Sequence, residues 1–171
     1  MMHKKTLLYI GGPTASGKTK VAIKLAKQYN TEIISCDSRQ FYKEMKIGTS
    51  VPSAKERKGI IHHFLQHKSI FENYNAGDFE KDAVALLEKL FKNRDLIIMA
   101  GGSGLYAKSV LEGLDYFPEI PIKIRNQIEK MYKEKGLKHL QETLAIVDPL
   151  YYKQVDLNNS RRLIRALEVF R

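Results

Sequence analysis

The residues best suited to chemistry form one run near the amino terminus: Gly12, Pro13, Thr14, Ala15, Ser16, Gly17, Lys18 and Thr19. The run fits the pattern G-x-x-x-x-G-K-[ST], in which glycines let successive backbone N–H groups turn toward phosphate oxygens. Lys18 would bring a cation to the phosphate, and the Thr19 hydroxyl would ligate Mg²⁺. The run therefore predicts a site for a diphosphate or nucleotide phosphate group.

A strand and a helix are predicted on either side of this run. Residues 7–10 are a short apolar stretch before it, and apolar residues recur at helical spacing from Val21 to Tyr29 after it. The helix would begin near Lys18 and add the positive end of its dipole to the same anion site.

A second buried strand is predicted at residues 32–36 and is followed directly by Asp37. Ligands of open α/β sheets bind at the carboxyl ends of the strands, which favours a functional Asp37 close to the bound phosphate. The alternative is that Asp37 only caps the turn that follows. Cys36 is interpreted as a small core residue.

A third buried strand is predicted at residues 95–100, and a glycine-rich turn then opens a helix that reaches Leu111. No acidic residue ends this strand, which weakens a motor-type ATPase interpretation and leaves a metal or base role to Asp37. The turn, Gly101 to Tyr106, is expected to form a wall of the site.

Three histidines, His62, His63 and His67, raise the question of a zinc site. Their spacing fits no usual ligand set and no cysteine completes one, so we predict structural roles in a short strand. A polar helical connection is predicted over residues 53–61. A core helix is predicted to start at Asp78 and to run to Phe91.

The composition describes a globular chain with a basic excess. The 171 residues carry a net charge of +10, contain one cysteine and hold no apolar run of membrane-spanning length. The apolar stretch near the amino terminus is too short for a signal peptide. The single cysteine is typical of a protein of the reducing cytoplasm. The basic excess would attract nucleic acid or simply favour solubility.

The character of the chain changes after residue 114. A proline-punctuated link at residues 115–121 precedes basic helices at 122–135 and 137–146, a segment after Pro149 and a capped helix at 158–168. Arginines in the first turns of that last helix oppose its dipole, so phosphate contact or a solvated basic face explains them better than helix stability. We predict a parallel α/β core at 1–114, of the P-loop NTPase-like class, with an appended helical module at 115–171.

Seven stretches together resemble the tRNA dimethylallyltransferase (isopentenyltransferase) family. They are the residues 12–19, Ile34-Ser35-x-Asp37-Ser38, Tyr42-Lys43 with Ile47-Gly48-Thr49, His62-His63, Ala76-Gly77-Asp78-Phe79, Gly101-Gly102-Ser103-Gly104-Leu105-Tyr106, and Arg162-x-x-Arg165-Ala166-Leu167-Glu168-Val169. The resemblance covers essentially the whole chain, and family members continue beyond the position of Arg171.

The resemblance implies transfer of a dimethylallyl group from dimethylallyl diphosphate to the exocyclic amine of the adenosine beside the tRNA anticodon. It implies that Asp37 is the general base, that Thr19 ligates Mg²⁺ and that residues 12–19 cradle the diphosphate. We also expect a cytoplasmic monomer. The implied contacts with the anticodon stem-loop are Asp37, Ser38, Arg39, Gln40, Ser103, Arg125, Arg161, Arg162, Leu163, Ile164 and Arg165. The chain departs from the family pattern at three places. Ser103 stands where the family often has threonine, and Asn159 stands where it usually has aspartate. The residues around His67 replace an acidic stretch that is common in the family.

Three other functions remain open from the residues. A P-loop small-molecule or nucleoside kinase shares the phosphate loop and the strand-end aspartate. A non-catalytic tRNA-binding fragment would explain the charge. Plant-type isopentenyltransferases, which modify free adenine nucleotides, are a closer variant.

Overall fold

The computed structural model describes residues 4–115 and 120–170. Contacts within the chain divide it into two compact units, Met1–Leu114 and Asp115–Arg171. Each unit has its own core and is described by itself.

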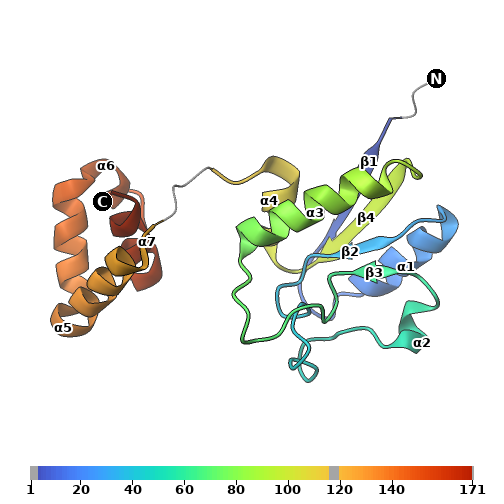
Figure 1. The fold of residues 1–171 in the computed structure, drawn as a ribbon, viewed down its shortest axis with the longest axis horizontal. Helices are drawn as coiled ribbons and strands as arrows, with labels where there is room; N and C mark the ends of the chain where they lie inside the picture. The colour runs from blue at the N-terminus through green and yellow to red at the C-terminus, as the bar shows by residue number, and fades with distance from the viewer. Residues whose placement is uncertain (1–3, 116–119, 171) are drawn as a thin grey trace. The chain divides into compact units, whose positions relative to one another are not determined.

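The first unit is built on a four-stranded parallel sheet in the order β1-β4-β2-β3 (Figure 1). Its strands are β1 (Thr6–Gly11), β2 (Ile33–Ser35), β3 (His62–His63) and β4 (Leu96–Gly101). Because every pair is parallel, all four carboxyl ends lie at one edge. The predicted parallel α/β architecture is confirmed.

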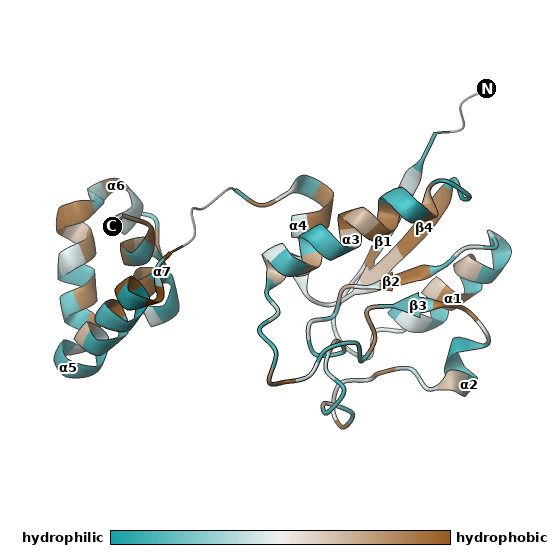
Figure 2. Ribbon diagram, in the orientation of Figure 1, coloured by the Kyte–Doolittle hydropathy of each residue, from teal (hydrophilic) through white to brown (hydrophobic). Residues whose placement is uncertain are grey.

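Helices cover both faces of this sheet. Helix α1 (Lys18–Gln28) covers one face, and α3 (Ala76–Leu90) and α4 (Gly104–Glu112) cover the other; the single turn α2 (Ala54–Arg57) buries no residue. Ile33 and Ile98 pack with the apolar residues of α1, whereas Ile34, Ile97 and Met99 pack with those of α3 and α4. The alternation follows from the two-residue period of a strand, and the apolar strands stand out in brown in Figure 2. Burial on both faces makes the strands a rigid base for the loops at their ends.

Two predicted helix bounds are wrong. Helix α3 begins at Ala76, two residues before the predicted Asp78, because Asn75 and Asp78 form a reciprocal capping box. The Asn75 Oδ1 accepts from Asp78 N at 3.2 Å, and the Asp78 carboxylate accepts from Asn75 N at 3.0 Å. The helical connection predicted over residues 53–61 is reduced to the single turn α2, which Ser53 caps.

Every element described in the second unit is a helix: α5 (Ile122–Val147), α6 (Pro149–Tyr152) and α7 (Ser160–Phe170). Gly136 interrupts α5 with a φ of 76°, which matches the break predicted between residues 135 and 137. Ile128, Leu140 and Leu163 are fully buried in its core. Residues 116–119 of the predicted link lie outside the described residues. None of the described helices has both the length and the apolar character needed to cross a membrane.

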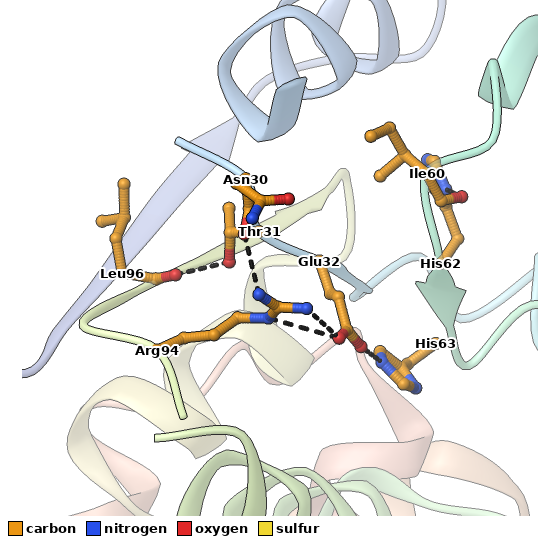
Figure 3. A network of polar contacts seen from close by, with 8 residues as sticks. All are labelled: Asn30, Thr31, Glu32, Ile60, His62, His63, Arg94 and Leu96. Atoms are coloured by element: carbon orange, nitrogen blue, oxygen red, sulfur yellow. Dashed lines mark hydrogen bonds and ion pairs between the residues drawn. The ribbon is translucent and has the colours of Figure 1, made fainter. Parts of the chain in front are cut away.

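A polar network fastens the amino ends of the central strands (Figure 3). Arg94, just before β4, donates to the Glu32 carboxylate at 2.8 Å and to the Asn30 carbonyl at 2.8 Å. His63 of β3 contacts the other Glu32 oxygen at 2.7 Å. Glu32 thus joins β2, β3 and β4 through one half-buried carboxylate.

His62 and His63 form the predicted short strand, β3, whereas His67 lies outside it. His63 is held by Glu32, and the ring of His62 lies 3.0 Å from the Ile60 carbonyl oxygen. The ring of His67 packs edge-on against Phe41 and Phe64. Each imidazole therefore contributes to packing or strand pairing.

The Glu32 network makes stability depend on pH. Burial alone would raise the pKa of Glu32, but hydrogen bonds from Arg94 and His63 outweigh it and hold that pKa below its usual value. Stability from a lowered carboxylate pKa is fully present above the unfolded pKa, about 4.3, and is lost as pH falls through the folded pKa. We expect Glu32→Gln to lower the free energy of unfolding by about 1–3 kcal/mol at pH 7.

Urea denaturation of both proteins between pH 7 and pH 3 checks this expectation. The difference between wild type and Glu32→Gln should shrink as pH falls below about 4. Glu88→Gln, which changes an exposed carboxylate on α3, is the matched control and should leave stability unchanged. A difference that stays constant across this pH range would contradict the assigned role of the Glu32 charge.

Candidate active site

The predicted phosphate loop, residues 12–19, connects β1 to α1 along a strained backbone path. Gly17 has a φ of 85° in the left-handed region, and Ala15, which carries a side chain, has a φ of 65°. Helix α1 begins at Lys18 without a side-chain cap, so its first N–H groups are free to face an anion. Lys18 Nζ donates to the Pro13 carbonyl oxygen, which holds the ammonium across the loop.

The loops after β1, β2 and β4 meet at the carboxyl edge of the sheet. A Cβ atom placed on Gly102 would lie 3.4 Å from the Gly12 carbonyl oxygen and 3.7 Å from Asp37 Oδ2. The strand order alone brings together three segments that are about 25 to 90 residues apart in the chain. The phosphate loop, the aspartate and the glycine-rich turn are thus parts of one site.

The position of Asp37 is compatible with both of the interpretations that the sequence left open. Its Oδ1 accepts from Arg39 N at 3.2 Å, so the carboxylate caps the turn after β2. The same residue lines the cavity beside the phosphate loop. Within the described chain Oδ2 has no hydrogen-bond donor from the protein, which leaves one carboxylate oxygen for a ligand or a proton.

Ser103 joins the glycine-rich turn to the turn after β2. Its Oγ accepts from Ser38 N at 2.9 Å and lies 3.0 Å from Ser38 Oγ. Both serines are half-buried, so their first role in this structure is to fix the wall of the site. Arg39 is exposed at the same turn.

Gln40 fastens a further loop to the site. Its side-chain amide donates to the carbonyl oxygens of Thr49 at 3.0 Å and Ser50 at 3.1 Å, and its Oε1 accepts from Ser35 Oγ at 3.1 Å. A glutamine in the turn after β2 therefore helps to set the position of the loop that contains Thr49 and Ser50.

A cavity of about 910 Å³ opens between the phosphate loop, Asp37 and this loop. Part of its lining was predicted from the sequence: Thr14, Ala15, Ser16, Gly17, Lys18, Thr19, Asp37, Gln40 and Gly101. Not predicted were Lys20, Lys24 and Lys27 of α1, Ser50, Val51 and Pro52 of the loop that follows Gln40, and Glu56 and Lys58 of α2 and its C-cap. The α1 lysines recur at helical spacing, a signal that the sequence did contain. Lysines outnumber carboxylates in this lining, which suits an anionic ligand.

The residues present fit a magnesium ion. Thr19 lies in the first turn of α1, and Thr19 and Asp37 both line the same cavity. Hydroxyl and carboxylate oxygens are the ligands that Mg²⁺ prefers, together with phosphate and water.

Cys36 is not a candidate nucleophile. It is fully buried, as predicted, and burial together with the neighbouring Asp37 charge raises the pKa of its thiol to about 12. A thiol that stays protonated at neutral pH is unreactive.

The predicted tRNA contacts of the second unit fall into two groups. Arg161 and Arg162 are exposed on α7, and Ile164 is half-buried there. Arg125 and Arg165 instead donate to the Glu168 carboxylate, at 2.9 and 3.1 Å, although Glu168 is only 1% exposed. These two arginines therefore stabilise the unit, a role that sequence analysis missed.

Leu163 differs from its neighbours on α7. Its side chain is fully buried in the core of the second unit, so the predicted tRNA contact at this residue could be made only by its backbone. The cause is the helical period, which turns Leu163 and Leu167 inward while Arg161 and Arg162 face outward. Asn159 performs the capping that an aspartate would, because its Oδ1 accepts from Arg162 N at 3.3 Å.

A family model described as IPP transferase matches residues 40–171. The chain belongs to the IPP transferase family. The tRNA dimethylallyltransferases of Flavobacterium psychrophilum and Christiangramia forsetii are each 52% identical to it over 95% of this chain. The alignments cover 55% and 54% of those relatives, so the chain spans about half the length of the curated relatives it matches.

Solved structures of the family share the fold. The tRNA isopentenylpyrophosphate transferase of Bacillus halodurans is 36% identical with a TM-score of 0.64, over 97% of this chain and 55% of that one. A eukaryotic dimethylallyltransferase described as acting on tRNA is 27% identical with a TM-score of 0.81, over 98% of this chain and 41% of that one. The similarity confirms both the family and the fold class predicted from the sequence.

The close approach of β4 to β2 predicts a strong effect at Gly101. A Cβ atom there would lie 2.5 Å from the Cys36 carbonyl carbon and 2.7 Å from Cys36 Sγ, and neither backbone can yield. We expect Gly101→Ala to lower the free energy of unfolding by about 3 kcal/mol in urea denaturation. Gly104→Ala is the matched control, because a Cβ atom at Gly104 meets nothing within 4 Å. It should change stability by less than about 1 kcal/mol, and equal effects of the two substitutions would contradict the contact.

Proposed function

We propose that this chain carries the donor site and the general base of a tRNA dimethylallyltransferase. The observation that carries the proposal is the meeting of the phosphate loop and Asp37 at one lysine-lined cavity, in a chain of the IPP transferase family. The reaction would move a dimethylallyl group from dimethylallyl diphosphate to the exocyclic amine of an adenosine beside the tRNA anticodon. The names of the relatives support tRNA as the acceptor.

In this proposal the phosphate loop holds the diphosphate of the donor. The free N–H groups at the start of α1, the helix dipole and Lys18 would stabilise the charge that develops on the leaving group. Lys20 and Lys24 on the same wall add positive potential. Magnesium, held at Thr19 with Asp37 nearby, would neutralise part of the diphosphate charge.

Asp37 would act on the acceptor side. One of its oxygens is held by Arg39 N, which orients the carboxylate so that the other can accept a proton. The adenine nitrogen forms a bond to the allylic carbon, the bond from that carbon to the diphosphate oxygen breaks, and the amine proton passes to Asp37. General bases of this kind contribute about 10²- to 10⁴-fold. The adenosine must leave the anticodon-loop stack to reach the cavity.

The proposal predicts opposite effects of two substitutions. Asp37→Asn keeps an oxygen for Arg39 N but removes the base, so transfer should fall by about 10²-fold or more while donor affinity changes little. Lys18→Ala should weaken donor affinity first, because it removes a cation from the diphosphate cradle. Titration calorimetry with dimethylallyl diphosphate and Mg²⁺ measures affinity, and single-turnover transfer of labelled donor to tRNA measures chemistry.

Two controls separate these effects from folding. Asp37→Ala, which also removes the cap of the turn, should lose transfer and some thermal stability, whereas Asp37→Asn should lose transfer alone. Lys81→Ala, an exposed lysine on α3, should leave donor affinity and transfer unchanged. Equal loss of affinity and transfer in Asp37→Asn, or unchanged donor affinity in Lys18→Ala, would contradict the assigned roles.

A further inference from the structure

Two adjoining loops of the first unit expose large apolar side chains to an unusual degree. Ile47 is 97% exposed and Phe71 is 90% exposed, the highest values among the large apolar residues described, and Ile70 is 50% exposed. A single exposed apolar residue is ordinary, but a group of them beside a site marks a contact surface. We define the two-loop surface as Ile47, Ile70 and Phe71 with the neighbouring Lys43 and Lys46.

Hydrogen bonds hold the two loops side by side. Lys43 N donates to the Lys68 carbonyl at 2.9 Å, and Lys68 N donates to the Phe41 carbonyl at 3.0 Å. The Glu44 carboxylate crosses between the loops and accepts from Ser69 Oγ at 2.8 Å and Ile70 N at 3.1 Å. The backbone that carries the exposed apolar side chains is therefore held in place by these hydrogen bonds.

The charge of the two-loop surface is positive. The two loops carry three lysines, Lys43, Lys46 and Lys68, against two glutamates, of which Glu44 bridges the loops and Glu72 accepts from Ser69 N at 2.7 Å. Lys43 and Lys46 are exposed, and in the described part of the chain neither has a carboxylate within ion-pair distance. Apolar side chains flanked by exposed lysines match a ligand that presents both flat rings and phosphates.

The two-loop surface is continuous with the cavity wall. Thr49 Oγ1 donates to the Met45 carbonyl at 2.6 Å, and Gln40 donates to the Thr49 carbonyl at 3.0 Å. Gln40 and Ser50 both line the cavity. The short loop that carries Ile47 at its tip thus ends in the wall of the candidate active site.

We propose that the two-loop surface binds unpaired nucleobases of the acceptor RNA, next to the adenosine that enters the cavity. This inference rests on the proposed function. Phe71 stacks on one base and Ile47 and Ile70 contact another through their apolar side chains, while Lys43 and Lys46 contact the phosphates between them. Bases of a single-stranded loop are open to such contacts, whereas bases of a duplex are not.

Binding of two RNA probes by the whole chain tests the inference. One probe is an anticodon stem-loop hairpin and the other a fully paired duplex of the same length, at one salt concentration. The Ile47→Ala and Phe71→Ala double variant should bind the hairpin roughly 5- to 150-fold more weakly for each stacked base lost. It should bind the duplex as wild type does, and Phe71→Trp should bind the hairpin as wild type does.

Two further variants separate stacking from charge and from folding. Lys46→Ala should weaken binding of both probes. It should also reduce the slope of log affinity against log salt concentration by about one, the loss of one phosphate contact. Val84→Ala, which truncates a 40% exposed residue of α3, should leave both affinities unchanged. Circular dichroism melting should show the same midpoint for all of these variants, because the side chains removed make few contacts.

Three outcomes would overturn the inference. The inference is wrong if the double variant binds the hairpin as tightly as wild type does. The proposed function would still hold in that case if wild type transfers label to tRNA. Failure of wild type to bind the hairpin would also overturn the inference. Loss of a dimer in the double variant, seen by sedimentation with RNA affinity unchanged, would identify a second copy of this chain as the occupant. Failure of the proposed function itself appears separately, as absence of label transfer by wild type.

Discussion

The site depends on how closely the ends of β2 and β4 approach each other. At Gly101 there is no room for even a methyl group against the backbone of Cys36, and Gly102 lies against both the phosphate loop and Asp37. Only glycine permits this approach, and the approach is what brings a carboxylate within reach of an anion cradle. The buried apolar strands supply the rigidity, and the network around Glu32 fixes their opposite ends.

Polar side chains then position the walls of the cavity. Ser103 joins two strand-end turns, Gln40 holds the loop that continues to Ile47, and Glu44 joins that loop to the next. Each of these side chains makes a few hydrogen bonds that connect separate segments of the chain. Such bonds contribute modestly to stability, but they define where cations and apolar side chains face. The proposed donor and acceptor contacts both depend on this positioning.

Much of the fold was predictable because its signals are local. A few consecutive residues were enough to predict the phosphate loop, the buried strands and the break at Gly136. The family resemblance was confirmed. The role of Gln40 and the inward pairing of Arg125 and Arg165 with Glu168 were not predictable, because each depends on a partner brought close only by tertiary folding. The burial of Leu163 was not predicted, because a matching motif does not show which side of a helix is buried.

The central claim is that the phosphate cradle holds a prenyl donor and that Asp37 directs it to an adenosine of tRNA. Incubation with labelled dimethylallyl diphosphate and Mg²⁺, in separate reactions with tRNA, AMP or no acceptor, tests it most directly. The account predicts label on the exocyclic amine of an adenosine beside the anticodon and none on AMP. Label on AMP alone, or phosphate transfer from ATP to a small molecule without prenyl transfer, would contradict it.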